Sequence, residues 1–96
     1  MHTVVRIYSG HGASDLVDLV IRSKPVAEEI MNSVPGFIHY AIMRTEEGGV
    51  TITSCASQEA SDEITRKTIA WAEEHAPDLH AARPQVIGGT VAWEIG

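Results

Sequence analysis

The chain has 96 residues, enough for one domain with a single hydrophobic core. Its formal net charge is −6 and its seven basic residues are scattered, which argues against a nucleic-acid partner because phosphate contacts need clustered Lys and Arg. The single cysteine, Cys55, excludes an internal disulfide framework and fits a reducing compartment. With no membrane-spanning apolar run and no signal peptide before the first strand pattern, we expect a cytoplasmic protein without a membrane partner.

The beginning of the chain predicts a strand, a loop and an interrupted helix. Residues 2–9 are rich in β-branched side chains and predict a strand, and the loop that follows offers Ser14 or Asp15 as a helix cap. Apolar residues then keep helical spacing, but Pro25 removes one backbone donor and clashes with the carbonyl group four residues before it. We therefore expect either a kinked helix or two segments, the second starting near residues 23–25.

A change of pattern at Pro35 and Gly36 marks the start of a hairpin. Pro35 disfavours helical geometry at the residue before it, and Gly36 can adopt a positive φ, so the pair ends the helix and redirects the chain. The pattern then predicts a strand over 37–44, a turn over 45–49 rich in Glu and Gly, and a strand over 50–57.

The remainder of the chain predicts a second helix and a last strand. The helix opens at residues 57–62 with acidic residues that suit its dipole, and Pro77 ends it. An apolar stripe at helical spacing consists of Ile64, Thr68, Trp71, Ala72 and His75. Residues 85–95 predict the last strand, with Gly88 and Gly89 as a bulge or bend.

The order β-α-β-β-α-β over residues 1–96 predicts one α+β domain with a ferredoxin-like fold, an antiparallel sheet with helices on one face only. Strict alternation gives the strand after Gly36 two apolar sides, one with Phe37, Ala41 and Met43 and the other with Ile38, Tyr40 and Ile42. A monomer would therefore expose an apolar patch. We expect a homodimer in which two sheets pack face to face.

A resemblance to a known family rests on this element order, the Val34-Pro35-Gly36-Phe37 junction, the Gly48-Gly49 hairpin and a Trp-containing second helix. The chain resembles the antibiotic biosynthesis monooxygenase (ABM) family over nearly its whole length. The resemblance implies a dimeric α+β barrel. Members of the family include quinone-forming monooxygenases that use no cofactor, and haem-degrading enzymes. In the haem-degrading members a Trp and a His of the second helix act with an Asn of the first strand, which residues 4–8 lack. We therefore expect no haem and no other cofactor.

Two histidines are the candidate catalytic residues. Trp71 and His75 lie one helical turn apart, so both side chains could reach one cavity. Alternatively, Trp71 belongs to the core and His75 lies near the helix C-terminus, where its positively charged form is favoured. His39, if it lines the barrel interior with Phe37, could accept a proton from a bound phenol near pH 7. The resemblance then implies reaction of the resulting carbanion with oxygen. The alternative is a structural strand histidine.

Other side chains suggest ligand contacts rather than chemistry. Tyr8, Arg6 and Arg44 could orient the polar ends of a ligand whose rings contact Phe37 and Trp71. Cys55 predicts a buried, inert thiol, since no catalytic His–Asn context surrounds it. The remaining histidines, His2, His11 and His80, are too dispersed for a metal site, so we expect none.

Two functional hypotheses follow. In the first, a homodimer binds a small hydrophobic or aromatic molecule and oxygenates it without metal or flavin. In the second, a dimer of the same fold is a non-catalytic ligand-binding or interaction module. A cavity lined by at least one His and one Arg would favour the enzyme, and a space filled by aliphatic side chains would favour the second hypothesis.

Overall fold

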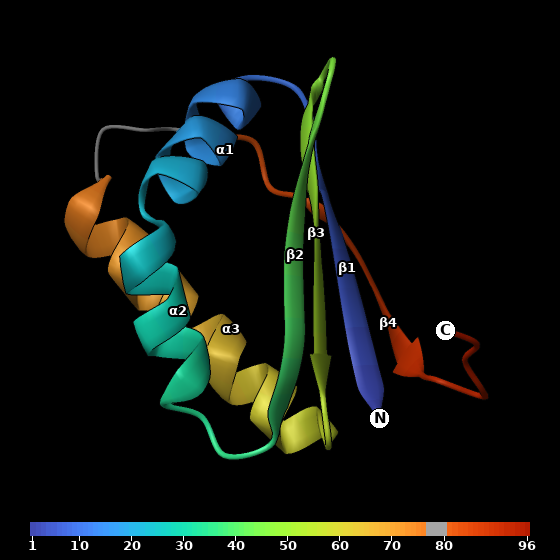
Figure 1. Cartoon of the computed structure of the whole chain (residues 1–96). Coiled ribbons are helices and arrows are strands. Elements are labelled where there is room, and N and C mark those ends of the chain that lie inside the picture. The colour runs from blue at the N-terminus through green and yellow to red at the C-terminus, as the bar shows by residue number, and fades with distance from the viewer. Residues whose placement is uncertain (77–80) are drawn as a thin grey trace.

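The computed structural model describes residues 1–76 and 81–96. Within them the elements are β1 (His2–Tyr8), α1 (Ala13–Arg22), α2 (Lys24–Asn32), β2 (Phe37–Thr45), β3 (Gly48–Cys55), α3 (Gln58–His75) and β4 (Gln85–Thr90). The helices cover one face of the sheet and leave the other face open (Figure 1). The strand order is β2-β3-β1-β4 with every neighbouring pair antiparallel, which confirms the α+β, ferredoxin-like prediction.

Pro25 divides the first helical stretch into two helices. α1 ends at Arg22, and Ser23 is both its C-cap and the N-cap of α2. Pro25 occupies the second position of α2, where its missing N–H would have had no partner inside the helix. The sequence left open a kinked helix or two segments, and the structure shows two separate helices.

α1 begins earlier than predicted. Its N-cap is Gly12, in the left-handed conformation with φ 75°, and neither Ser14 nor Asp15 caps it. α3 begins as expected, because the hydroxyl of Ser57 accepts a hydrogen bond from the Ala60 backbone N–H at 3.2 Å. The predicted stop at Pro77 lies outside the described residues.

The hairpin between β2 and β3 has a shorter turn than predicted. Only Glu46 and Glu47 separate the two strands, while Gly48 and Gly49 pair within β3. A Cβ atom on Gly49 would come within 2.8 Å of the Val17 side chain in α1. The two glycines therefore do not form the turn, and Gly49 allows α1 to pack close to the sheet.

A β-bulge near the start of β2 changes which side chains face the helices. Phe37 pairs with Cys55 and His39 with Ser54, so Ile38 is an extra residue without its own partner. Beyond the bulge Tyr40 and Ile42 share the helix-facing side with Phe37, and His39 falls on the open side. The strict alternation expected from the sequence, which put Phe37 with Ala41 and Met43, is wrong for this reason.

β4 ends before the prediction said it would. Its pairing with β1 is regular through Gly88 and Gly89, so no bulge occurs there. The pairing with β1 ends at Thr90, and the Val91 N–H then donates to the Met1 carbonyl at 2.9 Å. Residues 91–96 therefore leave the sheet as an extended tail (Figure 1), and Trp93 and Ile95 are 75% and 86% exposed.

The core lies between the sheet, α2 and α3. It consists of Met31, Val34, Cys55, Ala60 and Ile64, with Phe37 and Tyr40 packed against it. Burial raises the pKa of the Cys55 thiol, so this thiol stays protonated and is a poor nucleophile at neutral pH. None of the helices in the described part of the chain combines the length and apolar character that crossing a bilayer requires.

Candidate functional site

Polar groups gather on the helix-facing side of the sheet. Arg6 on β1 donates from its guanidinium to the Thr65 hydroxyl of α3, which places the charge between sheet and helix. Tyr8 follows two residues later on the same side, and Thr51 lies opposite Arg6 on β3. Tyr40 of β2 completes this group, which we call the polar cluster: Arg6, Tyr8, Tyr40, Thr51 and Thr65.

Both tyrosines of the polar cluster are held in their neutral form. Burial raises the pKa of Tyr40 to about 12, the neighbouring Tyr8 adds to the rise, and the charge of Arg6 opposes it. Burial also raises the pKa of Tyr8, against smaller opposing effects of Arg6 and of a hydrogen bond with Thr51. At neutral pH the two phenols are therefore O–H donors beside a guanidinium.

A groove lies between the α1–α2 helix pair and β2, with a volume of about 280 Å³. We call it the α2–β2 groove. Its lining is mostly apolar and consists of Val20, Ile21, Lys24, Ala27, Glu28, Met31, Asn32, Phe37, Tyr40 and Ile42. The charged residues among these, Lys24 and Glu28, form an exposed i,i+4 ion pair at 3.6 Å.

The groove and the polar cluster share one side of the sheet. Tyr40 belongs to both, since it lines the groove and interacts electrostatically with Tyr8 and Arg6. The register supplies a second connection: Ile42 in the groove lies opposite Thr51, which in turn lies opposite Arg6. Tyr40 is thus the member of the polar cluster that lines the groove, and it is where the two regions adjoin.

The structure brings together some of the ligand-contact residues expected from the sequence. Phe37 lines the groove, and Arg6 and Tyr8 lie in the polar cluster. Arg44 lies elsewhere: its guanidinium pairs with the Asp18 carboxylate of α1 at the surface. Arg44 is not among the described residues that line the groove, and its role as a ligand contact stays a prediction.

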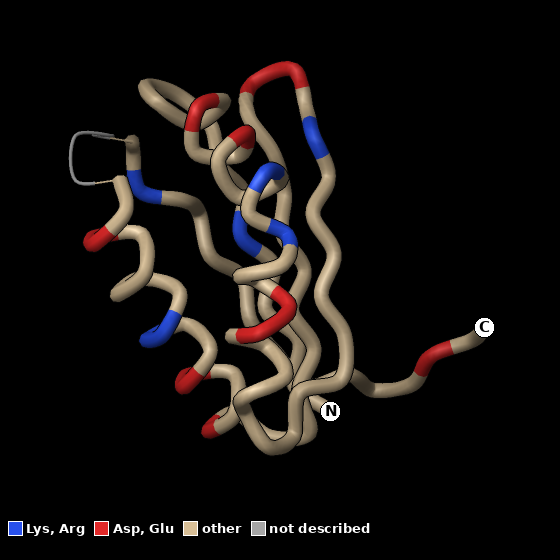
Figure 2. Tube along the Cα trace, turned by 60° about the vertical axis from the view of Figure 1, so that its left-hand side comes forward, with Lys and Arg blue, Asp and Glu red and all other residues tan. Residues whose placement is uncertain are grey.

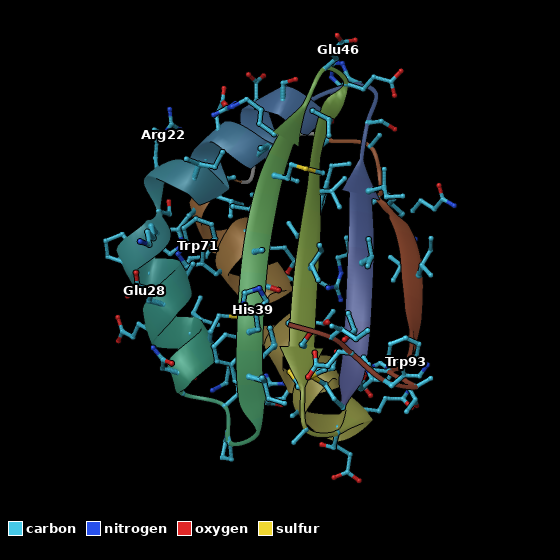
Figure 3. All side chains as sticks on the ribbon, turned by 45° about the vertical axis from the view of Figure 1, so that its right-hand side comes forward. Arg22, Glu28, His39, Glu46, Trp71 and Trp93 are labelled. Atoms are coloured by element: carbon cyan, nitrogen blue, oxygen red, sulfur yellow. The ribbon has the colours of Figure 1, made fainter. Side chains whose placement is uncertain are left out.

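Trp71 and His75 do lie together, although outside the groove lining. Their rings stack with centroids 5.0 Å apart and an interplanar angle of 20°. The His75 Nδ1 atom is 3.0 Å from the Trp71 carbonyl oxygen, and His75 is exposed. Figure 3 shows Trp71 on the helix-covered side of the sheet.

His39 lies on the other face of the sheet. It is exposed and pairs with Ser54, whose hydroxyl is 2.9 Å from that of Thr3. Figure 3 shows its side chain on the open face, whereas Phe37 contacts the core under the helices. The Ile38 bulge puts His39 and Phe37 on opposite faces, so the condition set for a shared interior is not met, and a catalytic role for either candidate histidine stays a prediction.

Sequence reasoning missed Tyr40 as a site residue. Under strict alternation Tyr40 and Phe37 fall on opposite sides, and only the bulge at Ile38 joins them. The available signal was the small number of tyrosines, since both of the two in the chain lie on strands near Arg6.

Charged residues lie mainly on the helices, the hairpin turn and the tail (Figure 2). The four strands carry only Arg6 and Arg44, and both face the helices. The four described strands therefore place no Asp, Glu, Lys or Arg side chain on the open face. Within residues 1–76 and 81–96, no three His, Cys, Asp or Glu side chains come together in a way that could hold a metal ion.

No family model and no curated protein matches the sequence. Solved structures do match. The heme-degrader MhuD of Mycobacterium tuberculosis, with two hemes in its active site, is 23% identical with a TM-score of 0.66, over 99% of this chain and 98% of that one. SnoaB of Streptomyces nogalater, a cofactor-independent oxygenase, is 17% identical with a TM-score of 0.68, over 98% and 95%.

A third similar structure is the monooxygenase ActVA-Orf6 of Streptomyces coelicolor in complex with nanaomycin D. It is 20% identical with a TM-score of 0.66, over 98% of this chain and 88% of that one. At these identities the likeness establishes the fold and nothing finer. The chain has the ferredoxin-like fold of the antibiotic biosynthesis monooxygenases.

Proposed function

We propose that this protein binds a small apolar or aromatic molecule in the α2–β2 groove. The observation that carries the proposal is the groove itself, about 280 Å³ with mainly aliphatic and aromatic walls and few polar groups. Its volume suits a ligand of one to three rings. The bound nanaomycin D and hemes in two proteins of the same fold support a small-molecule site.

Blocking the groove tests this proposal. Ala27 of α2 lines the groove, so Ala27→Trp fills it, whereas Glu29→Trp adds the same bulk at an exposed position outside the lining. Titration of 2-naphthol and related aromatics, followed by amide chemical shifts, should show at least tenfold weaker binding to Ala27→Trp and unchanged binding to Glu29→Trp. Equal binding to both variants would place the ligand elsewhere.

Oxygenation without metal or flavin is the second candidate function, supported by the likeness to SnoaB. In that reaction a bound phenol loses its proton, O₂ adds to the ring carbon, and the hydroperoxide loses water to leave a quinone. The described residues that line the groove include neither His nor Arg. The proposed proton acceptors, His39 and His75, lie outside that lining, so binding without catalysis is the function that the groove itself supports better.

Oxygen uptake separates the two functions. A catalytic protein consumes one O₂ for each phenol converted to quinone, releases no H₂O₂, and loses activity in His39→Ala or His75→Ala. If oxygen uptake is the same with and without protein for every phenol that binds, the protein does not catalyse the reaction and ligand binding is its remaining function.

We also propose that the protein is a homodimer whose open sheet faces pack together. The open face is mainly apolar, with Val5, Ile7, Val50 and Ile52 half-buried and Met43 56% exposed, and its polar side chains include those of Thr3, His39 and Ser54. Such a patch on an isolated domain is typical of an interface. A monomer at micromolar concentration by sedimentation velocity would contradict this. We place the dimer in the cytoplasm, as its single cysteine suggests, and cell fractionation tests that assignment.

A further inference from the structure

We propose that the ligand of this site is an anion, an aromatic molecule with one carboxylate or phenolate group, and that Arg6 is the counter-ion that binds it. The proposal rests on the groove as the ligand site and adds the ligand's charge to it. No residue of the α2–β2 groove lining requires an anion, so the argument comes from Arg6 and its surroundings.

Arg6 is a half-buried cation without a carboxylate partner among the described residues. Its hydrogen-bond partner there is the neutral Thr65 hydroxyl. The ion pairs of the described residues all lie at the surface and join Lys24 to Glu28, Arg44 to Asp18 and Arg66 to Glu63. Acidic side chains outnumber basic ones by 13 to 7, so carboxylates are abundant, but none of those described pairs with Arg6.

A buried charge is costly unless it is paired, and a guanidinium offers five N–H donors. The other members of the polar cluster do not neutralise Arg6. Tyr8 and Tyr40 keep their protons, and Thr51 is an uncharged hydroxyl. They supply further donors around the same place. A carboxylate or phenolate oxygen would therefore find a cation and several O–H groups with no competing anion.

The position of Arg6 suits a ligand that enters from the groove. β1 and β2 flank β3, so at about 4.8 Å per strand spacing they lie roughly 10 Å apart. A molecule of two or three fused rings covers that span, with its rings against Phe37 and Ile42 and its anionic end at Arg6. Tyr40, which belongs to both regions, lies along this path.

Lys24 is the rival counter-ion because it lines the groove. Its ammonium group is exposed and paired with Glu28, so solvent and a carboxylate already compensate its charge. It therefore serves as the matched control: Arg6→Gln and Lys24→Gln each remove one positive charge near the groove. The net charge of −6 would by itself repel an anion, so anion preference needs a local cause.

The test compares two probes with one ring system, 2-naphthoate and the neutral 2-naphthamide, by isothermal titration calorimetry at pH 7. We expect the wild type to bind naphthoate at least tenfold more tightly. Arg6→Gln should lose this preference while naphthamide affinity stays within about twofold, Arg6→Lys should regain part of it, and Lys24→Gln should keep it. Raising the salt concentration should weaken naphthoate binding only.

The outcomes separate this inference from the proposed function. If neither probe binds, or if both bind equally well to Ala27→Trp, the groove is not the site. If naphthamide binds as tightly as naphthoate, or if Arg6→Gln keeps the anion preference, the groove stands and the role of Arg6 is refuted. Should Arg6→Gln not fold, the probe ratio and its salt dependence in the wild type and Lys24→Gln decide the matter.

Discussion

The two faces of the sheet differ in the opposite sense from most antiparallel sheets, in which the covered face is apolar and the free face polar. Here the face under the helices carries Arg6, both tyrosines and the buried threonines Thr51 and Thr53. The open face carries mainly aliphatic side chains, together with Thr3, His39 and Ser54, and no Asp, Glu, Lys or Arg of the described strands.

This difference indicates that neither face is complete in one isolated chain. An apolar open face is stable in water only when something covers it, and a second copy of the same face is self-complementary. A buried charge is stable only when it is paired, and among the described residues the guanidinium of Arg6 has the neutral Thr65 hydroxyl as its partner and no carboxylate. The first prediction acts on the open face, the second exchanges the two faces locally, and the third acts on the helix-facing side.

The largest effect is expected from Ile52→Asp. Ile52 lies on β3 at the centre of the open face, opposite Val5 on one side and Ala41 on the other. In a dimer this variant would bury two unpaired carboxylates near each other, at a cost of about 5 kcal/mol, or roughly 1,000-fold or more in the dissociation constant. Sedimentation velocity over a concentration series measures it.

Gln58→Glu is the control for Ile52→Asp, because it adds the same charge at the exposed first turn of α3. Circular dichroism should show that both variants stay folded. If Ile52→Asp dimerises like the wild type, the open face is not the interface.

The next effect comes from shortening β2 by one residue at two different places. Removing Ile38 deletes the bulge and leaves every other β2 side chain on its present face. Removing Ala41 instead moves side chains to the opposite face of the sheet, because a one-residue slip flips every side chain of the strand segment that shifts. If the segment before the deletion shifts, His39 and Tyr40 exchange faces, and if the segment after it shifts, Ile42 and Met43 exchange faces. We expect the Ala41 deletion to lower the free energy of unfolding by about 3 kcal/mol, from lost core packing and buried polar groups.

Urea unfolding of the two deletion variants measures the difference between them. The Ile38 deletion should cost clearly less than the Ala41 deletion. If the Ile38 deletion lowers the free energy of unfolding more than the Ala41 deletion does, the bulge itself stabilises β2. In that case, which β2 side chains face the helices would not determine stability.

The same bulge shows what could be predicted from the sequence. The element order, the break at Pro25 and the hairpin after Gly36 follow from local rules about backbone donors and dihedral angles, and the structure agrees with them. A bulge depends on how one strand registers against its neighbour, which no single-strand pattern reveals. The sequence therefore left open which face carries His39, and the bulge is what puts His39 and Phe37 on opposite faces.

The end of the chain shows a second limit. Residues 85–95 have a strand pattern throughout, but β4 pairs with β1 over Gln85–Thr90 and ends there. Propensity indicates which residues suit a strand and not whether a neighbouring strand exists. Arg6 and Tyr8, in contrast, lie two residues apart in a strand and share one face, because β1 is regular along its whole length.

The smallest effect concerns ionisation on the helix-facing side. Burial raises the pKa of Tyr40 to about 12 from an ordinary value of 10.0. Between these values the unfolded chain has lost the proton and the folded chain keeps it, so stability falls as pH rises. At pH 11 this amounts to about 1 kcal/mol. Tyr40→Phe should therefore lose less stability than the wild type between pH 8 and pH 11, as measured by urea unfolding.

Absorbance at 295 nm provides an independent reading, because the chain contains only two tyrosines and the pKa of each is raised. In the folded wild type both should titrate above pH 10, and Tyr40→Phe should remove the later transition. Ionisation of both near pH 10 in folded protein would show that solvent reaches the polar cluster freely. Arg6 would then be hydrated, and the contrast between the two faces would be much weaker than the structure indicates.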